Sequence, residues 1–301
     1  MLRGPDAQST RFLTDLAEIT KRMDRAQREI TSGRRINTAS DDGDQISSLL
    51  AARSDLGLAE QILENLGRIK TETDTAEQAI SQSIDAMDRI VTLGTQGASD
   101  LVDANARATI ASEIEQLLAQ IVNLSNTQLE GRYLFAGDTD QVLPYTLDWT
   151  QADATSPYAG STSTREAQHP SGLRFSLSLT ADVIFDNSDP NKNVFDSVNE
   201  LRTALNADDS TAVNAALGKA RTSHTHLNSS LSFYGGVQNQ VQAATDTAQK
   251  RIVTLQTQIS NIQDADLTSA ILELNQSRLL QETALQAQAR RTQTSLFDYL
   301  R

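Results

Sequence analysis

Apolar residues recur at alternating steps of three and four along most of this chain, which is typical of helices that pack through one narrow face. The first such series ends just before Gly33, a residue that often terminates helices. We therefore expect a helix over residues 9–32. Its inward face would be formed by Phe12, Leu16, Ile19, Met23, Ala26 and Ile30.

The same rhythm predicts a long second helix, from about residue 45 to residue 95, closed by Gly94 and Gly97. Ser40, Asp41 and Asp42 precede it and are natural caps. Several positions on its apolar face are small or polar, so this helix should need more than one neighbour. The face consists of Leu66, Ile69, Thr73, Ala76, Ile80, Ser83, Met87 and Ile90. A third helix should follow and end at Gly131, with Ile110, Ile114, Leu117, Ile121 and Leu124 on one face.

The period changes to two in the middle of the chain, where four of the five prolines also cluster. Leu173, Phe175, Leu177 and Leu179 alternate with polar residues, as expected for a strand with one buried face. Residues 133–135 and 183–185 are further strand candidates. Proline breaks helices, so the sequence predicts a small β-rich insert between two helical flanks.

Helical spacing returns after the insert. We expect a helix over residues 194–207 and then, after Asp208, Asp209 and Ser210, one of about fifty residues ending near Ile262. Gly235-Gly236 is its weak point, because each glycine costs about 1 kcal/mol inside a helix. A last helix should begin after Asp264 or Asp266 and run to the end of the chain.

The predicted fold is mainly α: long antiparallel coiled-coil helices from both chain ends form a rod, with the small β-rich domain inserted in the middle. Five segments follow from this interpretation. They are an assembly helix and loop at 1–45, rod at 46–131, the insert at 132–192, rod at 193–263 and a C-terminal assembly helix at 264–301.

Composition narrows the possible partners and locations. The net charge of −13 argues against nucleic-acid binding, which needs clustered Lys and Arg. There is no cysteine, so disulfides and thiolate chemistry are excluded. No apolar run approaches the ~20 residues of a membrane span, and the first residues lack the apolar stretch of a cleaved secretory signal. We expect no nucleic-acid and no membrane partner.

Catalytic and metal-binding patterns are missing from the sequence, so we expect no enzyme, cofactor or metal site. His224 and His226 should project from opposite faces of a helix. An acidic cluster from Asp41 to Asp44 has Ala52 where a calcium loop needs Glu, which favours helix capping. Trp149 could form a sugar platform with Tyr145 and Tyr158, but a core explains these residues more simply.

Two stretches resemble the flagellin family. Residues 30–42, Ile-Thr-Ser-Gly-Arg-Arg-Ile-Asn-Thr-Ala-Ser-Asp-Asp, look like the family's signature after its first helix, and residues 262–267, Ile-Gln-Asp-Ala-Asp-Leu, resemble the turn before its last helix. The flanking heptads agree in order and spacing. The stretches at 130–137 and 295–300 are similar to the hook–filament junction branch of this family, hook-associated protein 3, although Gly4-Pro5 departs from the usual start.

The resemblance implies a structural, extracellular subunit of the bacterial flagellum that joins hook to filament. It implies export by the flagellar type III apparatus without a cleaved signal peptide, and a cytoplasmic export chaperone at the C-terminal helix. Partners would be other copies of itself, an adjacent hook-associated protein on the hook side and flagellin on the filament side.

The mechanism that this implies is packing of the terminal helices with neighbouring subunits, which offsets the entropy of ordering them. The expected assembly residues are Leu16, Ile19, Met23, Ile30, Ile271, Leu274, Leu285, Leu296 and Leu300. Two alternatives stay open: a divergent flagellin that forms the filament itself, and a binding or hydrolytic module in the insert.

Overall fold

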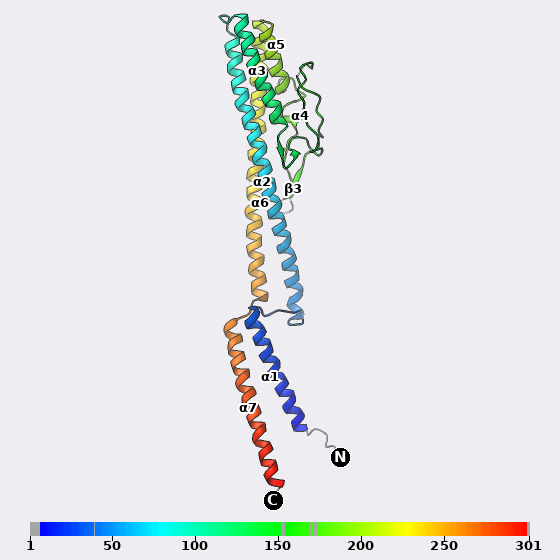
Figure 1. Cartoon of the computed structure of the whole chain (residues 1–301), viewed down its shortest axis with the longest axis vertical. Coiled ribbons are helices and arrows are strands. Elements are labelled where there is room, and N and C mark those ends of the chain that lie inside the picture. Colours follow the sequence, from blue (N-terminus) through cyan, green and yellow to red (C-terminus); the bar gives the residue numbers. More distant parts are fainter. Residues whose placement is uncertain are drawn as a thin grey trace. The chain divides into compact units, whose positions relative to one another are not determined.

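The computed structural model describes residues 7–38, 40–151, 154–168, 170, 172 and 174–299, and the side chains of residues 10–290 within these ranges. The chain divides into two compact units. Unit 1 comprises the described parts of residues 1–59 and 250–301, and unit 2 comprises those of residues 60–249. Both units are built mainly from helices, as the sequence predicted (Figure 1).

In unit 1 the two ends of the chain lie side by side. Helix α1 (Ala7–Ser32) packs against α7 (Leu267–Tyr299), and the two run antiparallel. Gly33 has φ +68 and its N–H donates to the carbonyl of Glu29, so it ends α1 in the left-handed conformation that glycine adopts most easily. The predicted pairing of helices from both chain ends is confirmed.

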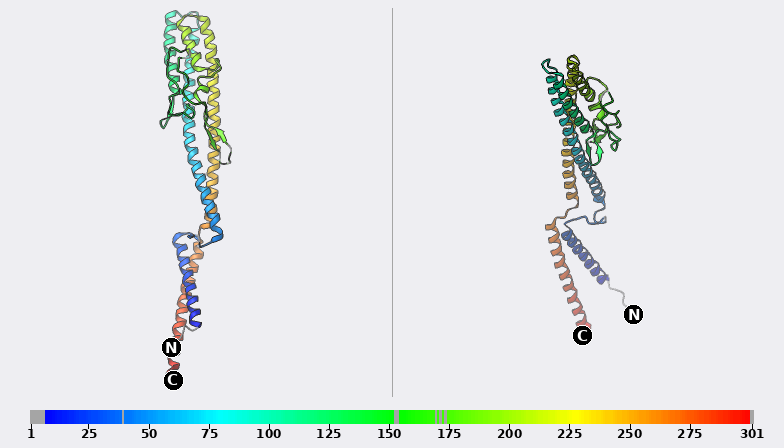
Figure 2. Two further views of the ribbon diagram at one scale, coloured as in Figure 1. Left: turned by 90° about the vertical axis from the view of Figure 1, so that its right-hand side faces the viewer. Right: turned by 45° about the horizontal axis from the view of Figure 1, so that its top comes forward.

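Helices α2 (Gly43–Gly97) and α6 (Ser210–Gln263) contribute residues to both units. In unit 2 they share a core with α3 (Ala104–Ser125) and α5 (Val194–Asn206). The predicted face of α2 is the buried one, including its polar members Thr73 and Ser83. Additional neighbours therefore cover a face too weakly apolar for a single partner. Figure 2 shows these helices gathered on one side and the insert on the other.

Close packing explains why α2 ends in glycines. A Cβ on Gly94 would lie 2.9 Å from a Leu201 methyl, and one on Gly97 would lie 2.4 Å from a Leu205 methyl. Both leucines belong to α5, so the glycines let α5 approach α2 closely. The capping predictions also hold here, since Asp209 accepts N–H bonds from Thr211 and Ala212.

The third helix ends at Ser125, six residues before the predicted Gly131. A hairpin occupies the remainder: β1 (Gln128–Leu129) pairs with β2 (Arg132–Tyr133). Its two-residue turn, Glu130-Gly131, has positive φ at both positions, which is the geometry of the tight turns that suit twisted strands. The glycine thus closes a turn of the hairpin and does not cap the helix.

The rest of the insert contains one further hairpin and long irregular segments. β3 (Glu166–Gln168) pairs antiparallel with β4 (Arg174–Ser176). β4 lies within the predicted alternating stretch, and the first residue of that stretch, Leu173, lies outside the described residues. The strand prediction at 183–185 is wrong. Residues Ala181–Ile184 form a short helix, α4, whose Ile184 and following Phe185 are buried in the core.

Among the residues that the structure describes, the large buried side chains of the insert share their core with the helices. Phe135, Tyr145 and Phe185 from the insert pack with Phe195 of α5 and Tyr234 of α6. Ring centroids lie 5.1 Å apart for Tyr145 and Phe195, and 5.9 Å apart for Phe185 and Phe195. The aromatic residues that the sequence concentrates in the middle of the chain therefore attach the insert to α5 and α6.

Candidate assembly surface

The terminal helices are held together by a set of backbone bonds that we call the clasp, formed by residues 33–36 and 262–265. Arg34 and Asp264 form an antiparallel bridge. The Arg35 N–H donates to the Gln263 carbonyl at 2.7 Å, and the Ala265 N–H donates to the Gly33 carbonyl at 3.0 Å. The clasp therefore fixes the end of α1 next to the start of α7.

Side chains reinforce the clasp. The Arg35 guanidinium donates to the Ile262 carbonyl at 2.8 Å and to the Asp42 carboxylate at 2.9 Å. Arg53 donates to the side-chain oxygen of Gln263, which is itself buried. The bond from Arg35 lowers the pKa of Asp42, because it stabilises the charged carboxylate. Ile36, buried to 2% exposure, anchors this loop.

The acidic loop before α2 is held by its own backbone. The Asp41 carboxylate accepts the N–H groups of Thr38 and Asn37 at 2.7 and 2.9 Å, and these bonds lower its pKa. Asp42 accepts the N–H of Gln45 at 3.3 Å in the first turn of α2. Asp42 thus caps the helix as predicted, and Asp41 instead folds the loop. Asp266 begins α7 by accepting the N–H groups of Thr268 and Ser269.

The α1 half of the expected assembly residues faces α7. Ala26 is buried, and the expected residues on this face are half-buried: Leu16, Ile19, Met23 and Ile30. On α7 the buried facing residues are the small Ala270 and Ser277, and the larger Leu274 is half-buried. Contact between α1 and α7 therefore buries little apolar surface per turn.

Helix α7 carries apolar residues outside that shared face. Leu272 and Leu279 are 64% and 61% exposed, and they lie seven residues apart on the side of the helix away from Ala270. Of the expected residues, Ile271 and Leu285 are about half exposed. The side chain of Leu296 and the whole of Leu300 lie outside the described part of the chain.

Sequence reasoning missed Leu272 and Leu279 because it followed one apolar stripe along each helix. Their seven-residue spacing is itself a signal, since residues seven apart lie on nearly the same side of a helix. This second apolar stripe of α7, which α1 does not cover, could have been found by looking for leucines outside the first stripe.

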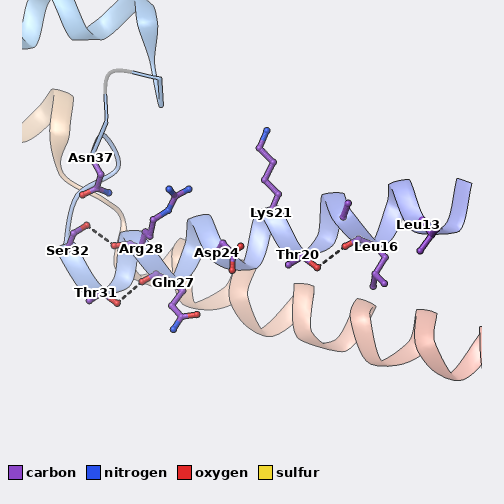
Figure 3. Close-up of a pocket in the computed structure, with 11 residues that line it drawn as sticks. Leu13, Leu16, Thr20, Lys21, Asp24, Gln27, Arg28, Thr31, Ser32 and Asn37 are labelled. Atoms are coloured by element: carbon purple, nitrogen blue, oxygen red, sulfur yellow. Dashed lines mark hydrogen bonds between the residues drawn. The ribbon is translucent and has the colours of Figure 1, made fainter. Parts of the chain in front are cut away.

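A shallow groove runs along α1 (Figure 3). Leu13, Leu16, Ala17 and Thr20 form its apolar part, and Leu13 is 60% exposed. Lys21 and Arg28 extend away from the helix in this view. The remaining lining residues are Asp24, Gln27, Thr31, Ser32 and Asn37. Unit 1 thus presents apolar surface on both of its terminal helices.

The other candidate sites have structural explanations. Tyr145 is buried and donates to Asp186, and Tyr158 donates to the carbonyl of Phe135, so neither forms a surface platform with Trp149. The Trp149 ring lies against the Arg202 guanidinium, 4.9 Å from the ring centroid. Burial raises the pKa of both tyrosines. The core interpretation of the two tyrosines is confirmed.

The histidines on α6 do not converge. His224 contacts Asp88 at 3.0 Å, whereas His226 bonds to the carbonyl of Val183 at 2.9 Å. Among the described residues, no three His, Asp or Glu side chains gather in a way that could hold a metal ion. Within the same residues, no helix is both long and apolar enough to cross a membrane.

Comparison with known proteins identifies the chain at the level of family. Residues 7–140 match the model of the bacterial flagellin N-terminal helical region, and residues 215–300 match that of the bacterial flagellin C-terminal helical region. The chain belongs to the flagellin family. It is therefore a structural component of the bacterial flagellum. The two stretches that carry the resemblance in sequence, 30–42 and 262–267, contain the residues that bond to each other in the clasp.

Several members of the flagellin family align along most of the chain. The flagellar filament 33 kDa core protein of Treponema phagedenis is 24% identical over 98% of this chain and 96% of its own length. Flagellar hook-associated protein 3 of Escherichia coli is 26% identical over 86% of each. The crystal structure of hook-associated protein 3 from Legionella pneumophila shares the fold, with a TM-score of 0.62, 13% identity, and coverage of 70% of this chain and 98% of that one.

Proposed function

We propose that this flagellar subunit is a non-enzymatic junction protein that joins hook to filament through its terminal helices. The observation that carries the assembly role is the exposure of Leu272 and Leu279 on α7, away from the face that meets α1. Exposed leucines repeated along a helix form an apolar stripe, and such a stripe gains free energy when another surface covers it.

Neighbouring copies would supply that surface. The groove along α1 is apolar at Leu13, Leu16 and Ala17, which suits the leucine stripe of α7 from a second subunit. Pairing unlike surfaces of two copies is a heterologous contact, and such contacts build rings or helical assemblies. The two ends of the subunit array would then contact a hook-associated protein on one side and flagellin on the other.

The junction role is favoured over the filament by the sequence at 130–137 and 295–300, which resembles the junction branch. The alignment with hook-associated protein 3 over 86% of both chains agrees with it. The filament remains the second candidate, because a filament core protein aligns over nearly the whole chain. We further propose an extracellular location reached through the flagellar export apparatus, with a cytoplasmic chaperone that holds the C-terminal helix beforehand.

Deletion of the gene separates the two candidates. A cell that lacks a junction protein should still build hooks but release flagellin into the medium, because the filament has nothing to attach to. Electron microscopy of the hooks and an immunoblot of the medium measure both outcomes. Attached filaments in the deletion strain would exclude the junction role.

Assembly through α7 is tested by the double substitution Leu272→Ala and Leu279→Ala. Both side chains are exposed, so the unfolding free energy of the subunit should change by no more than about 0.5 kcal/mol, while complementation of the deletion strain should be lost. The matched control is Asn275→Ala with Glu282→Ala, which removes exposed polar side chains from the same helix. Full complementation by the leucine variant would rule out this surface.

A further inference from the structure

Glycines in this protein fall into groups according to what requires them. Some have positive φ, as at Gly33 and Gly131, and others admit a close neighbour, as at Gly94 and Gly97. A third group meets neither condition, since an added Cβ would touch nothing within 4 Å and no positive φ is present. Its described members all lie in α2 and α6: Gly43, Gly57, Gly67, Gly218, Gly235 and Gly236.

Gly235 and Gly236 are the adjacent pair of that group, and they lie in the interior of α6. Each glycine gives up about 0.5–1 kcal/mol of helix stability relative to alanine. Neither the packing nor the backbone conformation of this subunit compensates for that loss. Adjacent glycines also permit the sharp bends that are rare elsewhere in helices.

The hydrophobic core is divided at the same level. Tyr234 belongs to the larger cluster, which contains the insert aromatics, whereas Val237 begins a second cluster that continues to Ala248. On α2 the larger cluster begins at Ala76, and the second contains Leu66. The glycine pair therefore lies between two clusters of unit 2, which share Phe233 as a partly buried neighbour.

Helix α2 is also weak at this level. Thr73 is buried, and its hydroxyl hydrogen bonds to the carbonyls of Ile69 and Lys70, both at 3.0 Å, an arrangement that often bends helices. A cavity of about 10 Å³ lies beside Thr73 and Tyr234. Gln238 of α6 donates to Asp74 at 3.0 Å, which places the weak points of the two helices next to each other.

The insert spans this division. Ala167 of β3 and Leu177 just after β4 pack in the second cluster, whereas Phe135 and Phe185 pack in the larger one. Just after this hairpin the Leu179 N–H donates to the Tyr234 hydroxyl at 3.2 Å, and both of these residues pack in the larger cluster. A bend at this level would carry the β3–β4 hairpin along with the second segment.

We propose that unit 2 contains a hinge at Gly235-Gly236 and Thr73, where α2 and α6 bend together and the β3–β4 hairpin follows the Val237–Ala248 segment. The hinge lets the segment that bears the aromatic core tilt without breaking either long helix. It does not depend on whether the subunit serves at the junction or in the filament.

Hydrogen exchange of the full-length chain, read by mass spectrometry, tests the hinge. Protection should pass through a minimum over residues 233–240 of α6 and, at the same level, over residues 70–77 of α2. Residues 70–77 contain no glycine, so low protection there cannot come from a glycine in α2 itself. Residues 220–227 and 84–91, which pack in the larger cluster, should exchange more slowly.

The double substitution Gly235→Ala with Gly236→Ala should slow exchange over residues 233–240 by about tenfold, and over residues 70–77 as well. Gly218→Ala is the matched control, because it adds the same methyl group to α6 in open space but away from the hinge. It should leave the α2 stretch unchanged. If residues 70–77 are as protected as 84–91, or do not respond to the double variant, α6 is merely weakened by its glycines and no hinge exists.

Discussion

Unit 1 and unit 2 are built from the same kind of helix but bury very different residues. Unit 2 encloses five aromatic rings among its fully buried side chains, together with Ile80, Met87 and Ile114. Unit 1 encloses mainly alanines and isolated aliphatic residues, and it leaves leucines of α7 exposed. The contrast indicates that unit 2 is stabilised within one subunit, and it supports our proposal that contacts outside the subunit complete unit 1.

The first effect that this comparison predicts is in amide exchange of the isolated subunit. Amides of α1 and α7 should exchange roughly a hundredfold faster than those of α2 between Ile80 and Ile90, since a helix with little buried apolar surface opens locally at low cost. Mass spectrometry in dilute buffer measures this ratio. Fully protected amides in both terminal helices would show that unit 1 needs no neighbour.

Removing an aromatic ring should reveal the core of unit 2. Phe195→Ala should lower the unfolding free energy by about 3–5 kcal/mol, because the ring is completely buried between Phe185 and Tyr145. Met23→Ala in unit 1 should cost far less, since Met23 is only half-buried. Denaturant titration measures both, and equal losses would contradict the comparison.

The clasp is where unit 1 has its most specific bonds. Arg35→Ala removes bonds to Ile262 and Asp42, and we expect a loss of about 1–2 kcal/mol for these partly exposed contacts. Exchange at the Ala265 amide reports the loss directly. Arg34→Ala is the control, because Arg34 takes part in the clasp through its main chain. A similar loss of unfolding free energy in both variants would show that the bonds of the Arg35 side chain do not stabilise the clasp.

Acid should weaken the loop that precedes α2. The folded-state pKa values of Asp41 and Asp42 are lowered, so their contribution to stability is complete above the ordinary value of about 3.9 and is lost as the pH falls through the folded values. Circular dichroism and amide exchange during an acid titration should show this loss. Asp41→Asn should flatten the pH dependence, and an unchanged profile would argue against the loop bonds.

The smallest predicted effect is a gain. Glu130 occupies the first position of a turn with positive φ, where Asn is favoured, so Glu130→Asn should stabilise unit 2 by about 0.5 kcal/mol. Glu130→Gln is the control, because it removes the charge without the conformational preference. A shift in the melting temperature for Asn alone would support the turn geometry, and equal shifts would assign the effect to charge.

Much of the fold could be predicted from the sequence because helix faces are set by local spacing. The series from Leu66 to Ile90 identified the buried side of α2, and Asp209 and Gly33 marked helix ends. The helical conformation of residues 183–185 was not predictable in the same way. A short apolar run fits a strand or a helix equally well, and contacts with residues distant in sequence, such as Phe195, decide between them.

The candidate site was only partly predictable for a related reason. The spacing of Leu16, Ile19 and Met23 shows that these residues share a face, but it does not show that α7 would cover that face and leave Leu272 exposed. The two stretches that form the clasp could be picked out only by their resemblance to the flagellin family. That they bond to each other depends on the meeting of segments more than two hundred residues apart, which no local pattern records.

The sequence separation across the clasp bears on when a newly made chain can pair its two terminal helices. Gly33 is synthesised more than two hundred residues before Ala265, so α1 cannot form the clasp until most of the chain has been made. A chain interrupted anywhere before residue 265 cannot form the paired ends at all. Pairing of α1 with α7 through the clasp is thereby restricted to molecules whose synthesis has passed residue 265.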